Sequence, residues 1–338
     1  MQPEDPTPCT REGQCSTRWP VHYADVCERG LDGSANSSSG RRRPPVHLVT
    51  FASSDYAHSL RRLRRQAQAM STFASITTTT DKDLEPSFRA KFSEFLQPGV
   101  RGFGYWMWKP EVILRALERI PEGEVLLYLD AGCHLNPAGR ARLSLYVKWV
   151  ATSASGLLAF QYRPFPSAPA NYPIERAESL LDRHYTKREA LEALDIEPQS
   201  PLLDDPAIAG GIIFVKKCGE SMASLHLWRE AVDKHPSAFT DQLDRSAQDS
   251  SFRDTRHDQS IFSILAKQRG IETVSAYETW VPKTSDHQPD WSPLVGFPIH
   301  ARRDLKRRLS AKEYLRSVKR ILGDSIDRVS RPPRQTPE

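Results

Sequence analysis

The sequence predicts an α/β fold, a mostly parallel β-sheet with helices on both faces. Short apolar runs of strand length alternate with segments of helical period along most of the 338 residues. One run, Val125–Leu129, leads straight into Asp130 and a turn of small residues. A carboxylate at the end of a buried parallel strand lies at the carboxyl edge of the sheet, where open α/β folds bind ligands. The alternative is that Asp130 only caps the next turn.

The first half of the chain contains two predicted strands and two predicted helices. Val46–Ala52 is the first strand, with Ser53 at its carboxyl end, where it either seats a ligand or caps a helix. Phe73–Thr80 alternates in the manner of a second strand. The helix between them carries an arginine run that is typical of a solvated face: Arg61, Arg62, Arg64 and Arg65. The next helix has an apolar face that we expect in the core: Phe88, Phe92, Phe95 and Leu96.

A glycine-containing aromatic segment, Arg101–Trp108, separates these elements from the Asp130 strand. A helix is expected to follow it, because Val112, Ile113, Leu114, Leu117 and Ile120 recur at helical spacing. The aromatic side chains either stack on a sugar or base or belong to the core.

The second half continues the alternation, with further strands expected around Leu157 and Val274. Ala207–Val215 is a buried strand that contains the pair Gly210 and Gly211. A glycine pair inside a strand is expected where the backbone passes close to another group. A later helix opens with Asp258 and Gln259 in its first turn, where a carboxylate also fits the helix dipole.

Composition limits which partners, scaffold types and cellular locations are expected for this protein. The formal net charge of +5 is compatible with a diphosphate-bearing substrate or an anionic surface, and we expect no nucleic-acid partner. Five cysteines without a Cys-x-x-Cys pair disfavour a disulfide scaffold and a zinc site. No apolar run reaches the roughly 18 residues of a membrane helix, and the amino terminus lacks an apolar signal core. We therefore expect a cytoplasmic protein.

Three segments are predicted to differ from the main domain, which we place at residues 46–305. Residues 1–45 are polar and proline-rich, so we expect a disordered tail. Residues 160–205 fill a long gap between strands and form a probable insertion on the acceptor side. Residues 306–338 are expected to form a basic helix followed by a tail. This helix either lies on an anionic membrane surface or packs back on the domain.

The order of these motifs resembles the nucleotide-sugar-dependent glycosyltransferases with a GT-A fold, of the glycogenin and lipopolysaccharide galactosyltransferase type. Tyr128–Gly132 is similar to the family's Tyr-Leu-Asp-Ala-Asp strand, and Ile208–Gly211 to its Asn-Ala-Gly strand. Asp258-Gln259 is similar to its Asp-Gln helix start, and His300 and Lys306 resemble its closing His and Lys. The resemblance spans roughly residues 46–306 and implies a Rossmann-type GT-A sheet.

The resemblance implies transfer of a hexose from a nucleotide diphosphate sugar, expected to be a UDP-sugar, to a glycan or lipid-linked acceptor. Asp258 and Gln259 would be catalytic, facing the acceptor and the anomeric carbon, with retention of configuration favoured. The donor would be bound by the following residues: Ser53, Arg101, Lys109, Asp130, Gly210, Gly211 and Lys306. Arg302 is a further candidate cation for the diphosphate.

The implied cofactor is Mn²⁺ or Mg²⁺, held by Asp130 and His300, with His134 as a partial substitute for a missing ligand. The second Asp of the family's Asp-x-Asp signature is Gly132 here, which puts metal binding in doubt. The same departure leaves open a catalytically silent protein of this fold that binds a nucleotide or glycan. A phosphatase with Asp130 as nucleophile ranks last, because Gly132 removes its second carboxylate.

Overall fold

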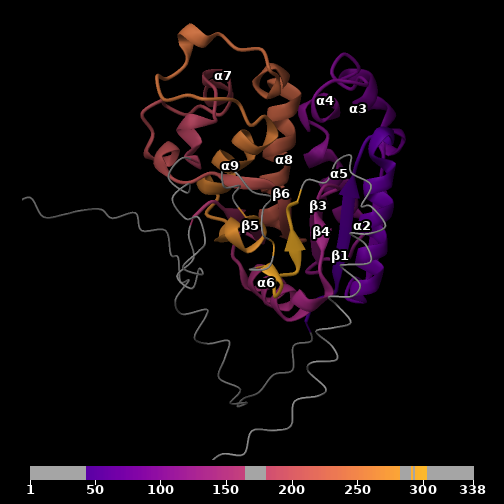
Figure 1. Cartoon of the computed structure of the whole chain (residues 1–338). Helices are drawn as coiled ribbons and strands as arrows, with labels where there is room; N and C mark the ends of the chain where they lie inside the picture. Colours follow the sequence, from indigo (N-terminus) through magenta and orange to yellow (C-terminus); the bar gives the residue numbers. More distant parts are fainter. Residues whose placement is uncertain (1–42, 164–179, 282–290, 292–293, 303–338) are drawn as a thin grey trace, which may run out of the picture. The chain divides into compact units, whose positions relative to one another are not determined.

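The computed structural model describes residues 43–163, 180–281, 291 and 294–302 (Figure 1). Contacts between Cα atoms divide the chain into residues 1–302 and 303–338, and every described residue belongs to the first unit. Nearly all of the predicted amino-terminal tail, residues 164–179 of the predicted insertion, and the basic carboxyl-terminal segment with Lys306 lie outside the described residues.

Six strands form one sheet in the order β2-β1-β3-β6-β5-β7. Their bounds are β1 Val46–Phe51, β2 Ser75–Thr79, β3 Val125–Asp130, β5 Leu157–Gln161, β6 Ile208–Lys216 and β7 Glu272–Ser275. β1 is parallel to β2 and β3, and β5 is parallel to β7. β6 lies between β3 and β5 and is antiparallel to both. The predicted mostly parallel sheet is confirmed, with β6 as its reversed strand.

Helices cover both faces of this sheet, as predicted (Figure 1). On one face, α5 (Lys109–Glu118), α8 (Gly219–Lys234) and α9 (Asp258–Gln268) pack in one hydrophobic core. On the other, α2 (Ala57–Met70) and α6 (Arg140–Thr152) pack in a second. Successive β3 side chains alternate between the two cores, Tyr128 in the first and Leu127 and Leu129 in the second. Tyr128 therefore lies on the same face as Lys109 and Asp258.

Two short helices, α3 (Pro86–Lys91) and α7 (Arg188–Ala193), and the short turn labelled α4 (Gly102–Tyr105) complete the main described elements. The helix expected across the phenylalanine face is shorter than its apolar pattern, because α3 ends at Lys91. Phe88 and Phe92 are nevertheless buried in the core, as predicted.

A second, two-stranded sheet pairs β4 (His134–Leu135) with β8 (Ile299–His300). His134 lies opposite His300 in this antiparallel pair. The pairing brings the end of the described chain beside the turn that follows Asp130, a proximity that sequence spacing does not reveal.

The described part of the predicted insertion packs on α9. Leu191 and Leu203 contact Ile264 of α9 in a small hydrophobic cluster. The Asp182 carboxylate accepts hydrogen bonds from Lys267 Nζ at 2.6 Å and Ser263 Oγ at 2.7 Å, both on α9. These contacts hold α9, and with it the position of Asp258 at its start. Within the described ranges no helix is long and apolar enough to cross a membrane.

Candidate active site

The predicted site residues meet around one buried ammonium group, that of Lys109 at the start of α5. Its Nζ donates to Asp258 Oδ2 at 2.5 Å and to the Gly210 carbonyl at 2.9 Å, and lies 3.5 Å from Asp130 Oδ1. An ammonium carries three N–H donors, so these three acceptors match its capacity. The Lys109 side chain is only 3% exposed. Residues from α5, β3, β6 and α9 are thereby joined at one point.

Charge explains how a lysine is held in the core. Burial by itself lowers the pKa of Lys109, but the carboxylates of Asp130 and Asp258 outweigh it and the pKa is raised from 10.5. Burial raises the pKa of Asp258 to about 6, with Lys109 opposing that rise and Asp130 adding to it. At neutral pH the cluster therefore contains one cation and two carboxylates, with net charge −1.

Asp130 is the member of this cluster that reaches solvent. It ends β3 opposite Phe51, the last residue of β1, so it lies at the carboxyl edge of the parallel strands as predicted. Its side chain is 37% exposed, against 5% for Asp258. Tyr128 Oη donates to Asp130 Oδ1 at 2.7 Å, which orients the carboxylate from the core side. The Asp130 carboxylate is therefore the acidic group of this cluster that a ligand can reach.

The glycine pair of β6 allows two side chains to approach its backbone. A Cβ at position 211 would lie 2.6 Å from Asp130 Oδ2, and one at position 210 would lie 3.3 Å from Gln259 Cα. The close approach expected of Gly210 and Gly211 is confirmed. The groups that approach are Asp130 and the start of α9, so the pair shapes the site through these side chains.

Asp258 and Gln259 do begin α9, as predicted. The Asp258 carboxylate faces inward to Lys109, whereas Gln259 is only half-buried. We expected Asp258 to face the acceptor. In the structure its buried ion pair makes it a positioning residue for Lys109, because the carboxylate needs a compensating charge once it is removed from water.

The aromatic segment before Lys109 adopts a left-handed turn. Gly102, Phe103, Gly104, Tyr105 and Trp106 all have positive φ, between 51° and 88°. Left-handed backbone costs L-residues about 1–2 kcal/mol each, and such strain concentrates at functional sites. Gly102 is required here, because a Cβ would lie 2.4 Å from the Trp106 ring.

This turn packs on the residue that precedes Asp258. The rings of Tyr105 and Trp106 lie 5.4 and 5.6 Å from the His257 ring, and His257 itself has φ of 55°. Its Nδ1 is 2.8 Å from the Phe239 carbonyl oxygen. Trp108 is buried, and the centre of its ring lies 3.9 Å from that of Phe51. Of the two roles expected for these aromatic residues, Trp108 therefore has the core role.

The other predicted site residues lie outside the Lys109 cluster. Ser53 is buried just beyond β1 and makes no side-chain cap hydrogen bond, which argues against its capping role. Arg101 lies beside the left-handed turn and forms an ion pair with Asp241 at 3.4 Å. His300 is buried on β8, and its Nε2 is 2.8 Å from the Leu294 carbonyl oxygen. Lys306 is outside the described residues.

The described residues around Asp130 do not form a preformed site for the expected divalent metal. Among the described residues, no group of three or more His, Cys, Asp or Glu side chains could hold an ion. Nε2 of His300 faces the Leu294 carbonyl, and Nδ1 lies 3.5 Å from Arg302 Nη2. His134 is neutral, because burial, reinforced by Arg62, Arg302 and His300, lowers its pKa to about 3. Its Nδ1 lies 3.2 Å from Gln66 Nε2.

The turn after Asp130 is held by a residue that the sequence pattern did not single out as a site residue, Arg62. Arg62 of α2 donates through Nη2 to the carbonyl oxygens of Ala131 at 2.7 Å and Cys133 at 2.9 Å. We assigned the whole arginine run to a solvated face, which is correct for its exposed members Arg61, Arg64 and Arg65. The helical pattern alone does not single out Arg62, because Arg64 lies as close to the buried face of Leu60, Leu63, Ala67 and Met70.

No family model matches the chain, and a search of curated proteins finds no match. Solved structures do match. A glycosyltransferase involved in glycosylation of the major capsid of PBCV-1 has a TM-score of 0.43 and 9% identity, over 81% of this chain and 100% of that chain. The galactosyltransferase LgtC, in complex with donor and acceptor sugar analogs, has a TM-score of 0.33 and 14% identity, over 75% of this chain and 86% of that chain. Mouse xyloside xylosyltransferase 1 has a TM-score of 0.37 and 9% identity, over 76% of this chain and 97% of that chain. All three of these proteins are glycosyltransferases.

The Lys109 cluster predicts a specific stability defect. Lys109→Met should lower the free energy of unfolding by about 3–5 kcal/mol, because it leaves the Asp258 carboxylate buried without its cation. Adding Asp258→Asn should recover part of the loss. Denaturant titration at neutral pH measures both.

The matched control is Lys91→Met, which removes an ion pair between Asp233 and a lysine whose side chain is 51% exposed. Its cost should stay below about 1 kcal/mol. Equal losses for Lys91→Met and Lys109→Met would show that the buried cluster contributes nothing special.

Proposed function

We propose that the chain is a glycosyltransferase that transfers a hexose from a nucleotide diphosphate sugar. The observation that carries the proposal is the Lys109 cluster, in which Asp130, Asp258 and the glycine pair meet at the carboxyl edge of the sheet. These are the residues that the GT-A resemblance assigns to the donor and to catalysis. Four separate segments thus converge where an open α/β sheet binds its ligand.

The arrangement supports the reaction through binding and charge. The half-exposed Asp130 would accept a hydrogen bond from a ribose or sugar hydroxyl of the donor. Transfer breaks the bond between the anomeric carbon and the phosphate oxygen, and the electron pair leaves on the diphosphate. The acceptor hydroxyl oxygen forms the new bond, and its proton is released to solvent. The Gln259 amide oxygen would stabilise the positive charge that develops at the anomeric carbon.

We further propose a UDP-sugar as donor and a glycan or lipid-linked glycan as acceptor, in cytoplasmic polysaccharide biosynthesis. The Asp258-Gln259 resemblance favours retention of configuration. Contact with an anionic membrane would use the basic segment after residue 305, where each surface cation contributes about 1 kcal/mol. The predicted insertion supports an acceptor role, because its described part packs on α9 behind the site.

A donor screen tests the proposal directly. UDP-hexoses should raise the melting temperature, measured by thermal shift beside ADP-, GDP- and dTDP-sugars, because a ligand that binds the folded state stabilises it by mass action. Asp130→Asn should abolish the shift while keeping a hydrogen-bond partner for Tyr128. Glu118→Ala, which removes an exposed carboxylate at the far end of α5, should leave it unchanged.

The enzyme assay separates catalysis from binding alone. UDP release with donor and acceptor glycan would support transfer, whereas binding without UDP release would indicate the catalytically silent alternative. If UDP-hexoses raise the melting temperature of Asp130→Asn as much as that of the wild type, Asp130 does not bind the donor.

Gln259→Ala should lower kcat by about 100-fold and change donor affinity little, because its amide is assigned to charge that exists only in the transition state. Initial rates and the donor Kd distinguish the two effects. Gln268→Ala, at the exposed end of the same helix, is the control. A loss confined to donor affinity would place Gln259 against the nucleotide instead.

The pH profile should report Asp258. Its pKa of about 6 means that the carboxylate takes up a proton as the pH falls through 6, and the Lys109 pair is then lost. We expect kcat/KM to fall on the acid side with a midpoint near pH 6, because kcat/KM reports ionisation of the free enzyme. Deprotonation of Lys109 should cause no loss of activity on the alkaline side below about pH 10, because the pKa of Lys109 is raised from 10.5. A midpoint near 4, the value of an ordinary aspartate, would contradict this assignment.

A further inference from the structure

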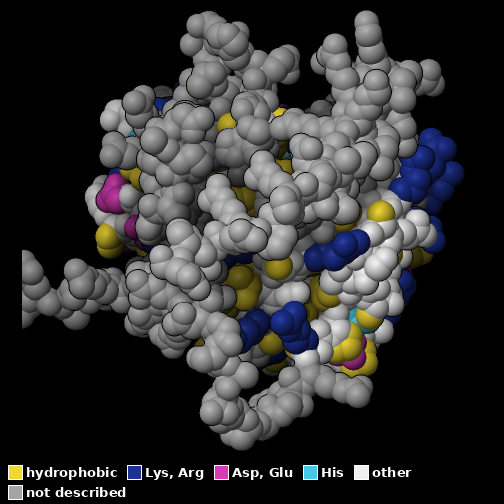
Figure 2. Space-filling model, turned by 60° about the horizontal axis from the view of Figure 1, so that its bottom comes forward, with side chains coloured by type: hydrophobic (Ala, Val, Ile, Leu, Met, Phe, Trp, Pro, Cys, Tyr) yellow, Lys and Arg dark blue, Asp and Glu magenta, His cyan; other side chains and the backbone are white. Residues whose placement is uncertain are grey.

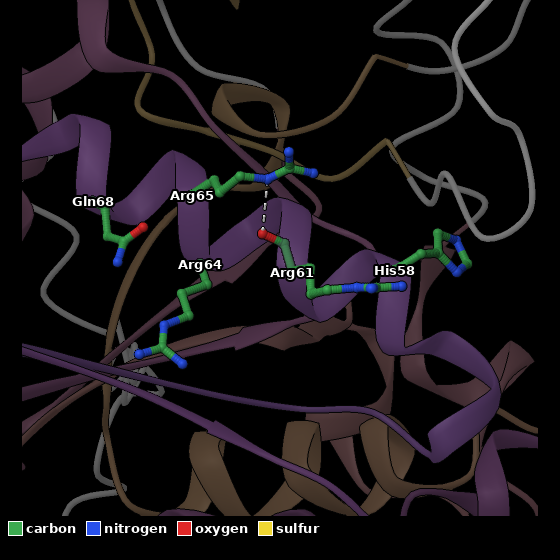
Figure 3. Close-up of a pocket in the computed structure, with 5 residues that line it drawn as sticks. All are labelled: His58, Arg61, Arg64, Arg65 and Gln68. Carbon is green, nitrogen blue, oxygen red and sulfur yellow. Dashed lines mark hydrogen bonds between the residues drawn. The ribbon is translucent and has the colours of Figure 1, made fainter.

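The outer side of α2 carries a row of polar, mostly basic side chains. His58, Arg61, Arg65 and Gln68 recur at helical spacing and form one stripe along the helix, with Arg64 beside it. All five residues are exposed, and they line one open hollow on the surface (Figure 3). The stripe extends over about 15 Å, because a helix rises about 1.5 Å per residue.

The three arginines of this stripe, Arg61, Arg64 and Arg65, form what we call the arginine row. Within the described ranges, no carboxylate forms an ion pair with any of them, and α2 itself contains no Asp or Glu. Arg65 Nε donates to the Arg61 carbonyl oxygen at 3.3 Å, which is a neutral acceptor. The row therefore presents three exposed positive charges on one side of one helix.

The arginine row starts near the candidate active site. β1 ends at Phe51, which lies opposite Asp130, and α2 begins shortly afterwards at Ala57. Because β1 and β2 are parallel, the helix between them runs from the carboxyl edge of the sheet back to the amino edge. The row therefore leads away from the edge where Asp130 lies.

A linear polyanion fits this row better than a membrane surface does. Helices that lie on membranes combine their cations with apolar side chains that enter the lipid. Among the described residues, Val295 is the one large hydrophobic side chain that is exposed, and it lies outside α2. Guanidinium groups remain protonated, and their planar N–H groups match the oxygens of carboxylate, as of phosphate.

We propose that the arginine row binds an acidic glycan, and that the acceptor of the proposed reaction is such a glycan. Charge and linear shape select a polyanion, and transfer to a glycan acceptor selects an acidic glycan among polyanions. This inference rests on the proposed glycosyl transfer. The acceptor end of the glycan lies near Asp130 and Gln259, and its anionic sugars follow α2.

Binding of a galacturonate oligosaccharide, measured by calorimetry without donor, tests the inference. This probe carries a carboxylate on every sugar, and a malto-oligosaccharide of equal length is its neutral counterpart. At low salt, the wild-type chain should bind the galacturonate oligosaccharide at least about tenfold more tightly than the neutral one. About 0.5 M NaCl should remove most of this difference, because salt screens exposed charges.

A variant that combines Arg61→Gln, Arg64→Gln and Arg65→Gln should weaken this binding by about tenfold or more, because three exposed charge contacts are lost together. The helix should stay folded, because glutamine has a helix propensity close to that of arginine and all three side chains are exposed.

A second combined variant is the matched control. Basic side chains outnumber acidic ones over the described surface in Figure 2, so removal of any surface arginine changes the general field. Arg119→Gln, Arg245→Gln and Arg269→Gln together remove the same charge from exposed positions outside α2. This control should keep the affinity for the galacturonate oligosaccharide within about twofold of wild type.

Several results would overturn the proposal. A wild-type chain without preference for the acidic oligosaccharide would do so, as would an equal loss in both combined variants, which indicates the general field alone. Unchanged binding in the α2 variant would assign the glycan to another segment. If that variant loses affinity only for phosphatidylserine vesicles or for an oligothymidylate, the row binds a membrane or a nucleic acid instead.

A separate measurement keeps the proposed function distinguishable. UDP-hexoses should raise the melting temperature of the α2 variant as much as that of the wild type, because the arginine row lies outside the Lys109 cluster. Absence of this shift in the wild type would contradict the proposed function, whereas the glycan measurement is made without donor.

Discussion

The rest of the site depends on burial of one ammonium group. Lys109 lies in the core, where an uncompensated charge would be prohibitive, and three acceptors from three other elements surround it. This requirement draws β3, β6 and α9 together. It also determines which carboxylate stays accessible: Asp258 is buried in the ion pair, whereas the Asp130 side chain is partly exposed.

Several features of the fold serve this arrangement. Gly211 lets the Asp130 carboxylate lie against the β6 backbone, and Gly210 lets α9 do the same. The left-handed turn at residues 102–106 places two rings on His257, directly before Asp258. At the other end of α9, Asp182 holds Lys267 and Ser263. The helix that carries Asp258 and Gln259 is therefore restrained at both ends, as preorganised electrostatics requires.

The turn after Asp130 is held by contacts from segments that are distant in sequence. Arg62 of α2 donates hydrogen bonds to the carbonyl oxygens of Ala131 and Cys133. The β4–β8 pair places His300 opposite His134, just after this turn. The conformation of the chain directly after Asp130 therefore depends on α2 and on the end of the described chain.

The sequence by itself determined the α/β class, the edge position of Asp130, and the close approach at Gly210 and Gly211. These follow from local patterns, because apolar period and glycine use report strands and tight backbone contacts. Only the tertiary structure decided which way the β6 strand runs, that Asp258 faces Lys109, and that Arg62 turns inward from an arginine-rich helix. The direction of β6 follows from its backbone pairing with β3 and β5. The other two depend on side chains that meet across 69 and 149 residues of chain, in the bonds from Arg62 to Ala131 and from Lys109 to Asp258. Long-range pairing of charge leaves no periodic trace in a sequence, and so the cluster became visible only in the fold.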